Sequence, residues 1–235
     1  MAIASPSKTR HRASLLDALP PLEPGDHLDQ KTFHARYEAM RNGVRAELIG
    51  GVVIMPSPAK RIHSRSHIKI GRWLDVYEDA TPGVEANSGG TTILGDESEP
   101  MPDVFLVISP VKGGQTKVDR DGYVVGAPEL IAEISYSTES YDLHGKKSDY
   151  EKAGVCEYVV VALRQKCVFW FVRKRGKFHE LAAGTDGVLR SQKFPGLWLD
   201  PAALLRLDGK RVMKVLNDGL ASPEHAAFVA KLAAK

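Results

Sequence analysis

The chain has 235 residues, of which 43% are hydrophobic and 26% are charged, and its formal net charge at pH 7 is +3. These values are typical of a globular protein with one main domain and tails. No apolar run approaches the ~20 residues that cross a bilayer, and the basic N-terminus lacks the apolar segment of a secretory signal, so we expect neither a membrane span nor a signal peptide. The charge permits a nucleic-acid partner without identifying one.

Residues 1–24 are predicted to form a mobile N-terminal arm, because prolines at positions 20, 21 and 24 separate this stretch from the patterned sequence after it. We expect the main domain to cover residues 25–205. A C-terminal helical extension is predicted over residues 206–235, where Ser222-Pro223 is a good helix start.

The main domain is predicted to begin with a helix and a hairpin. The helix runs from Asp29, its N-cap, to about Met40, and Asn42-Gly43 ends it. Two short strands follow within residues 46–55, and Gly50-Gly51 forms the turn between them.

A second, longer helix is predicted from Ala59 to Glu78, because its apolar residues fall mainly on one stripe. Another face carries cations spaced by four, four and three residues: Arg61, Arg65, Lys69 and Arg72. A charge row on an amphipathic helix is usually its solvated face. The competing interpretation is that the row follows a phosphate backbone, in which case each neutralised phosphate adds salt dependence to binding.

Strand patterns dominate the middle of the chain. Strands are expected at residues 91–94, 104–108, 130–134 and 158–163, and as a hairpin of 166–172 with 177–181. The two cysteines, Cys156 and Cys167, lie in such runs and form no C-x-x-C motif, so we expect buried thiols in a reducing, cytoplasmic environment.

Two carboxylates stand out among these strands. Glu133 lies inside an apolar run, where a charge is costly unless it is compensated. Asp103 stands at the start of another apolar strand. If the two strands are adjacent, the carboxylates lie ~5 Å apart and repel by roughly 3 kcal/mol at an effective dielectric of ~20, unless a cation sits between them. Two carboxylates and a backbone carbonyl, that of Ile134, are oxygen ligands that suit Mg²⁺ or Mn²⁺.

A helix after Glu133 brings further polar groups. Asp142, Lys146 and Tyr150 follow one another at intervals of four residues and therefore fall on one helical face. Lys146 could orient or deprotonate a metal-bound water, or neutralise a charged phosphate in the transition state. The alternative is structural: Asp103 caps a turn and Glu133 pairs with Lys146.

Two more residues could complete such a site. Glu47 begins the first strand and could bind metal, although an ordinary strand-edge glutamate is the more common case. His63, near the start of the long helix, could contact phosphate or water as a neutral imidazole, although a helix-start histidine is more often simply exposed. The sequence contains no P-loop, no G-x-G-x-x-G turn, no H-E-x-x-H and no G-x-S-x-G motif.

The order of several short motifs resembles the Uma-type restriction endonucleases, a branch of the PD-(D/E)XK nuclease superfamily. The resemblance spans residues 27 to 205. Its first half rests on Glu47-Leu48-Ile49, on Met55-Pro56-Ser57-Pro58 with His63, and on Pro102-Asp103-Val104. Its second half rests on Pro128 to Ile134, on Asp142, Lys146 and Tyr150, on Gly154-Val155 and Glu157-Tyr158, and on Ser191 with Phe194 to Leu197.

The resemblance implies an α/β (α+β) fold of restriction-endonuclease type, with a mixed central sheet flanked by helices, and metal-dependent cleavage of DNA. It implies that Asp103 and Glu133 bind Mg²⁺ or Mn²⁺ and that Glu47 assists. Ser135 stands where the superfamily lysine would be, and Lys146 of the following helix matches the lysine of this branch. The chain departs from the family at Ala46, at Gly50-Gly51-Val52, at Val159 and at Ala162.

We therefore predict an Mg²⁺-dependent endonuclease whose catalytic residues are Asp103, Glu133, Lys146 and Glu47. Its DNA contacts would be Arg61, His63, Arg65 and Lys69. A homodimer is plausible because cutting both strands usually needs two active sites. The alternatives are an inactive nucleic-acid-binding or assembly protein on the same scaffold, and a hydrolase of another phosphate ester.

Overall fold

A computed structural model describes residues 19–40 and 44–235. The chain divides into two compact units. The first comprises the described residues up to Ser57 together with Gly95–Pro100, and the second comprises Pro58–Leu94 and Met101–Lys235. None of the described helices combines the length and the apolar character that crossing a membrane requires.

The first unit contains one helix and one hairpin. Helix α2 (Gln30–Ala39) begins after Asp29, whose side chain accepts a hydrogen bond from the Thr32 amide at 2.8 Å, so the predicted N-cap is confirmed. The predicted helix end at Asn42-Gly43 lies outside the described residues. So does most of the predicted arm, although Leu22 is buried in the core of this unit.

The hairpin of the first unit is the predicted one. Strands β1 (Glu47–Ile49) and β2 (Val52–Ile54) pair antiparallel. Gly50 and Gly51 join them with φ angles of 55° and 77°, a left-handed conformation that glycine adopts without steric cost.

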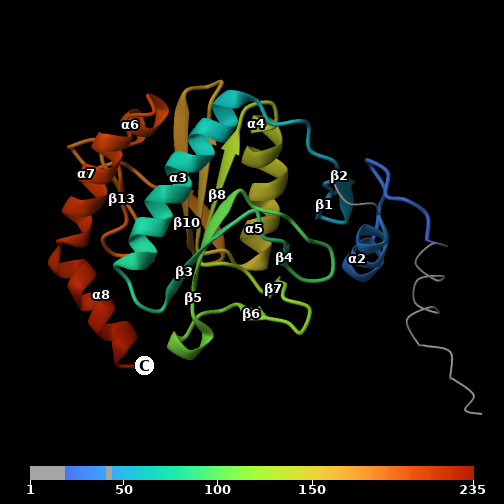
Figure 1. Cartoon of the computed structure of the whole chain (residues 1–235), viewed down its shortest axis with the longest axis horizontal. Helices are drawn as coiled ribbons and strands as arrows, with labels where there is room; N and C mark the ends of the chain where they lie inside the picture. The colour runs from blue at the N-terminus through green and yellow to red at the C-terminus, as the bar shows by residue number, and fades with distance from the viewer. Residues whose placement is uncertain (1–18, 41–43) are drawn as a thin grey trace, which may run out of the picture. The chain divides into compact units, whose positions relative to one another are not determined.

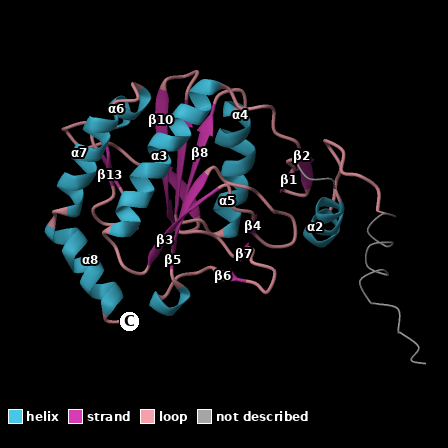
Figure 2. Ribbon diagram, viewed as in Figure 1, coloured by secondary structure: helices cyan, strands magenta, loops and turns pink. Residues whose placement is uncertain are grey.

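The second unit is built on a mixed six-stranded sheet in the order β11-β10-β9-β8-β5-β3 (Figures 1 and 2). Strands β8 and β9 are parallel, and all other neighbours are antiparallel. The strands are β3 (Val84–Ser88), β5 (Val104–Ile108), β8 (Leu130–Ser135), β9 (Glu157–Ala162), β10 (Cys167–Lys174) and β11 (Lys177–Glu180). The second unit also contains two small sheets. The first has three strands in the order β4 (Thr92–Ile93), β7 (Val124–Val125) and β6 (Lys117–Val118), and the second pairs β12 (Leu189–Arg190) with β13 (Trp198–Leu199).

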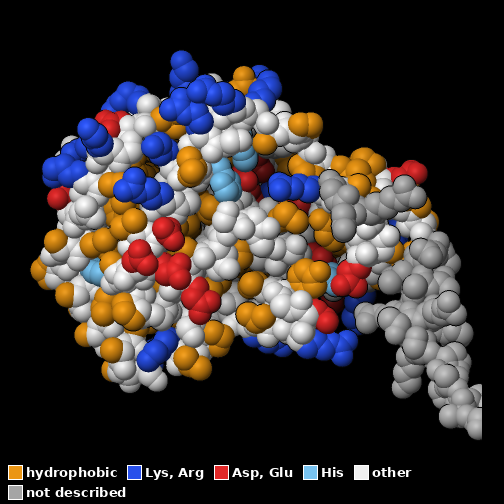
Figure 3. All heavy atoms as spheres, in the orientation of Figure 1, with side chains coloured by type: hydrophobic (Ala, Val, Ile, Leu, Met, Phe, Trp, Pro, Cys, Tyr) orange, Lys and Arg blue, Asp and Glu red, His pale blue; other side chains and the backbone are white. Residues whose placement is uncertain are grey.

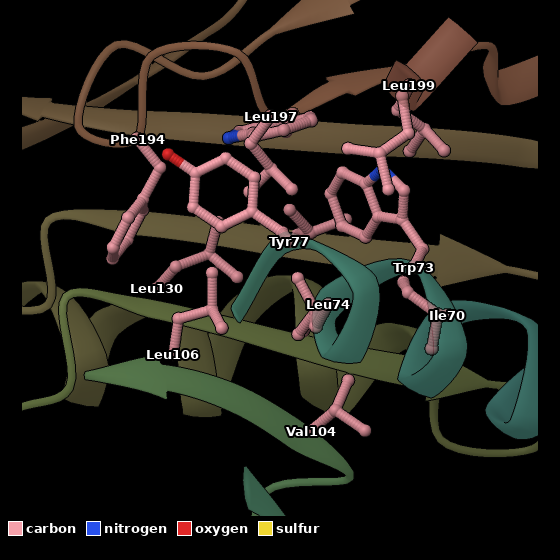
Figure 4. Close-up of a cluster of buried hydrophobic side chains, with 14 of the residues drawn as sticks. Ile70, Trp73, Leu74, Tyr77, Val104, Leu106, Leu130, Phe194, Leu197 and Leu199 are labelled. Atoms are coloured by element: carbon pink, nitrogen blue, oxygen red, sulfur yellow. The ribbon is translucent and has the colours of Figure 1, made fainter. Parts of the chain in front are cut away.

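One face of the large sheet packs against α3 (Arg61–Asp79) and three C-terminal helices, α6 (Pro201–Leu205), α7 (Gly209–Leu220) and α8 (Pro223–Ala233). Figure 4 shows Trp73 and Tyr77 of α3 between the sheet and the β12–β13 segment. Both rings are fully buried, and their polar atoms donate to the carbonyls of Trp198 and Pro195 at 2.9 and 2.8 Å. Truncation of a buried aromatic of this kind to alanine costs about 3–5 kcal/mol.

The opposite face packs against a helix made of three segments, α4 (Glu139–Tyr141), the π-helical turn η2 (Asp142–Lys146) and α5 (Lys147–Ala153). Tyr150 and Tyr158 are fully buried there, with ring centroids 5.0 Å apart. Odd-numbered residues of β5 and β8 point to this face because side chains alternate along a strand. Asp103 and Glu133 share that parity and therefore this face.

The predicted fold is confirmed, since the sheet is mixed and helices flank it. The predicted strands and the long helix are present within one to three residues of the expected bounds. The sequence did not predict the π-helical turn. Cys156 and Cys167 are free, but both are half-buried, so the expectation of buried thiols was wrong.

Candidate active site

Asp103 and Glu133 come from neighbouring antiparallel strands. Strand β5 pairs with β8 so that Val104 lies opposite Ala132, and continuing this register by one residue places Asp103 opposite Glu133. The amide of Asp103 donates to Glu133 Oε2 at 3.3 Å, and the amide of Ile134 donates to Asp103 Oδ2 at 2.8 Å. Side chains directly opposite in a ladder lie on the same face. The two carboxylates are thus adjacent at one end of the sheet.

The negative charge of Glu133 is compensated by neighbouring side chains of the protein. It is 4% exposed, and its Oε1 accepts hydrogen bonds from Lys146 Nζ at 3.0 Å and from the Tyr150 hydroxyl at 2.8 Å. Both side chains of the ion pair are more than nine-tenths buried. A buried carboxylate persists only with such partners, because desolvation of an unpaired charge costs several kcal/mol.

Asp103 is the more accessible acid, with 21% of its side chain exposed. Its Oδ2 lies 3.3 Å from His63 Nε2. Burial would raise the pKa of Asp103, but the bonds from His63 and from the Ile134 amide outweigh burial and lower that pKa. The same contact raises the pKa of His63, against the effect of its burial. Asp103 is therefore held as a carboxylate, the form that binds metal.

The start of α3 lies beside Asp103. His63 contacts the Asp103 carboxylate, and His67 Nε2 is 3.0 Å from the Asp103 carbonyl oxygen. The N-cap, Lys60, makes no side-chain capping bond, and the first turn contains no acidic residue. Lys60 Nζ instead lies 4.4 Å from the centre of the Tyr136 ring. A helix N-terminus with uncapped amides and nearby cations favours an anion such as a phosphate.

The π-helical turn positions the residues that face β8. Lys146 and Tyr150 both reach Glu133, whereas Asp142 Oδ2 accepts from the Ser135 hydroxyl and, at 2.6 Å, from the Thr138 hydroxyl. Wide turns of this kind inside helices occur frequently at functional sites. Ser135 is thus engaged by Asp142, and the cation that contacts Glu133 comes from the helix.

The donor set suits a hard divalent cation. Asp103 and Glu133 offer carboxylate oxygens, and Asp103 Oδ1 accepts no protein hydrogen bond from the described residues. The Ile134 backbone approaches the same place, since its amide donates to Asp103 Oδ2 at 2.8 Å. Within residues 19–40 and 44–235, no three His, Cys, Asp or Glu side chains gather into a metal site. A cation here would therefore rely on two carboxylates, a carbonyl and water, as Mg²⁺ commonly does.

A profile described as "Uma2: Putative restriction endonuclease" matches residues 31–202, about three quarters of the chain. The chain belongs to the Uma2 family. Among solved structures, it is similar to one titled a putative nuclease belonging to DUF820 from Anabaena variabilis ATCC 29413, at 14% identity and a TM-score of 0.53. The similarity covers 72% of this chain and 97% of the other, and at this identity it shows the fold alone. No curated protein matches the chain.

Not every predicted residue of this Uma2 protein belongs to the group around Glu133. Glu47 is 7% exposed in the first unit, so its part in the site stays a prediction. His63 is in the group, although it had been expected as a phosphate or water contact rather than as a partner of Asp103. Arg61 and Arg65 are exposed on α3, and Lys69 is half-buried.

Two residues of the site were not predicted as members. Tyr150 was recognised only as part of a polar helix face, although it binds the same oxygen as Lys146. Its position one turn after Lys146 was the available signal. His67 was weighed only as a zinc ligand and rejected, although it follows His63 by one turn and stacks with it at 6.2 Å between ring centroids.

Proposed function

We propose that this Uma2 protein is an Mg²⁺- or Mn²⁺-dependent endonuclease that hydrolyses phosphodiester bonds of DNA. The observation that carries the proposal is the adjacency of Asp103, Glu133 and Lys146 at one end of the sheet. Family membership supports the reaction class, and the fold of the Anabaena variabilis structure, titled a putative nuclease, is consistent with it.

In the proposed site, Asp103, Glu133 and the Ile134 carbonyl hold the cation. A bound Mg²⁺ would lower the pKa of a coordinated water and offset the charge that develops on the phosphate. The reaction forms a bond from the water oxygen to phosphorus and breaks the bond from phosphorus to the leaving sugar oxygen, which takes a proton. No redox partner is needed.

Lys146 has the position of an organising group in this reaction. Its ammonium nitrogen lies 3.0 Å from Glu133 Oε1, and the side chain is buried, so bulk water does not replace this contact. Its positive charge lies beside the proposed cation site, where it can stabilise the negative charge that develops in the transition state. Tyr150 supports this geometry by holding Glu133 from the same side.

The start of α3 supplies a place for the phosphate. Its uncapped amides, Lys60 and His63 lie at the end of the helix next to Asp103. Cations and free amides at such a position favour an anionic substrate.

Cleavage of plasmid DNA with Mg²⁺ or Mn²⁺ tests the proposal. We expect wild-type cleavage to depend on the metal, to vanish with Asp103→Ala, and to persist with Asp75→Ala, which removes an exposed carboxylate from α3. Equal cleavage by wild type and Asp103→Ala would indicate a contaminant. Absence of cleavage on DNA of varied sequence and strandedness would favour an inactive binding protein, and cleavage of small phosphodiesters alone would favour another phosphate ester as substrate.

A further inference from the structure

A polar hollow of about 670 Å³ lies between α3 and α7 of the second unit, away from the acids of the candidate site. Four cations line it: Lys69 and Arg72 from α3, and Lys210 and Lys214 from α7. Two carboxylates also line it, Asp208 and Asp218. Figure 3 shows Lys and Arg side chains gathered over α3, α6 and α7.

Cations outnumber carboxylates in this hollow by four to two. Asp218 pairs with Lys214 at 2.7 Å, and Asp208 caps α7 by accepting from the Arg211 amide at 3.1 Å. Among the described residues, Lys69, Arg72 and Lys210 have no ion-pair partner. Four cations and two carboxylates leave the hollow with an excess of two positive charges, contributed by two helices more than a hundred residues apart in the sequence.

The first turn of α7 shows the same bias. It contains Lys210 and Arg211 and no acidic residue. Cations at a helix N-terminus oppose the helix dipole, and here the carboxylates nearby are Asp208, which caps the helix, and Asp200, which pairs with Arg211 at 2.9 Å. Lys69 approaches this turn closely, because a Cβ built on Gly209 would lie 3.0 Å from its Nζ. An anion in the hollow would offset the mutual repulsion of Lys69 and Lys210.

The hollow lies along α3 from the candidate site. His63 contacts Asp103, and Lys69 and Arg72 follow it by six and nine residues. At 1.5 Å per residue these intervals correspond to roughly 9 and 14 Å of helix axis. That is the length of about three to four base steps of duplex DNA at 3.4 Å each. Arg61 and Arg65 lie on the same face of α3 as Lys69 and Arg72, whereas His63 lies on the opposite side of the helix. A backbone held near Asp103 would therefore reach the hollow by crossing the face that carries Arg61 and Arg65.

We propose that the α3–α7 hollow binds the phosphodiester backbone of DNA a few nucleotides from the scissile bond, and that this is the role of the C-terminal helix α7. The inference rests on the proposed nuclease function. Lys69, Arg72 and Lys210 each neutralise phosphates, and Lys214 does so on leaving Asp218. The contact is independent of base sequence, since no part of it reads base edges.

The test measures binding without cleavage. Fluorescence anisotropy of a 30-base-pair duplex in EDTA, at several salt concentrations, compares wild type with the double variant Lys69→Gln, Lys210→Gln. We expect weaker binding and a salt slope smaller by about 1.8, since two phosphate contacts are lost. The matched control is Lys117→Gln with Lys231→Gln, two exposed lysines elsewhere, and we expect its slope to equal that of wild type. Equal thermal melting of both double variants shows that folding is retained.

The outcomes separate this inference from the proposed function. An unchanged slope in Lys69→Gln, Lys210→Gln overturns the inference even if wild type cleaves DNA. A reduced slope, with the control unchanged, supports it even if no cleavage is found. Equal losses in both double variants would mean a diffuse charge effect and would also overturn it.

Discussion

Lys146 and Glu133 are thirteen residues apart in the sequence and form a buried ion pair with 3.0 Å between Nζ and Oε1. The superfamily pattern would place this cation at position 135, two residues after the glutamate on the same strand. Here Ser135 occupies that position and bonds Asp142, and the helix brings the ammonium to the carboxylate. The Lys146 ammonium thus contacts Glu133 through its position in the folded chain, although it does not have the two-residue spacing of the superfamily pattern.

Replacement of Lys146 by methionine should impair both stability and cleavage. Removing one partner of a buried ion pair leaves an uncompensated charge and costs about 3–5 kcal/mol. We expect cleavage to fall by at least about 100-fold at a temperature where the variant is folded. Lys152→Met is the matched control on the same helix, because Lys152 is exposed, and it should behave as wild type. Wild-type cleavage by folded Lys146→Met would exclude a role for the ammonium.

Tyr150→Phe tests whether the second partner of Glu133 positions the site. The variant loses a buried hydrogen bond of 2.8 Å to a carboxylate, which should destabilise the fold by about 1.5–3 kcal/mol. Cleavage should also fall, because Glu133 gains freedom to turn. Tyr158→Phe is the comparison, since its hydroxyl donates to the Asp142 carbonyl at 3.1 Å in the same cluster. We expect Tyr158→Phe to lose less stability, because its partner is a neutral carbonyl, and to keep wild-type cleavage, whereas Tyr150→Phe should lose both.

Two glycines on helices should respond to alanine with opposite signs. A Cβ on Gly219 of α7 would lie 2.2 Å from the Gly196 carbonyl oxygen, so Gly219→Ala must separate α7 from the β12–β13 segment and should cost about 1–3 kcal/mol. On Gly71 of α3 the nearest atom, in Val104, would be 3.8 Å away. Gly71→Ala should therefore stabilise the protein by up to about 1 kcal/mol. Urea unfolding of both variants checks this, and destabilisation by both would contradict the packing described for α3.

Glu157 should make the stability of the fold depend on pH. Burial raises the pKa of Glu157, and hydrogen bonds from Ser191, from the amides of Lys193 and Gln192, and from the Trp170 indole oppose that rise without cancelling it. The folded state then holds the proton more tightly than the unfolded state, so this residue favours folding more as the pH falls from its raised pKa toward the ordinary value of about 4.3.

The variant Glu157→Gln isolates that effect. We expect the stability of wild type relative to Glu157→Gln to increase as the pH is lowered from 7 toward 4.5, because other titrating groups cancel in the difference. Urea unfolding of the two proteins across this range is the measurement. A difference that is constant, or that shrinks toward low pH, would show that the pKa of Glu157 is not raised.

Local patterns predicted most of the fold. The apolar runs of β5, β8 and β9 and the turn residues of the β10–β11 hairpin were sufficient, because each strand is bounded by residues that end it. The two acids were recognised because a charge inside an apolar run is rare. Their adjacency depends on the register between β5 and β8, which the hydrophobic pattern of single strands does not contain.

Other features near the site could not be predicted from the sequence alone. The π-helical turn arises from tertiary packing of the helix on the sheet, and no residue in Asp142–Lys146 signals it. The hollow between α3 and α7 joins segments distant in sequence, so the cations Lys69 and Lys210 could not be connected in advance. The row of cations on α3 alone was open to the ordinary interpretation of a solvated face.

Crystals of the protein soaked with Mn²⁺ test the central claim most directly. The proposal predicts an anomalous scattering peak within about 2.5 Å of a carboxylate oxygen of Asp103 and of Glu133, and no such peak in Asp103→Asn crystals. A fully soaked wild-type crystal with no manganese between these two acids, or with manganese bound only elsewhere, would contradict it.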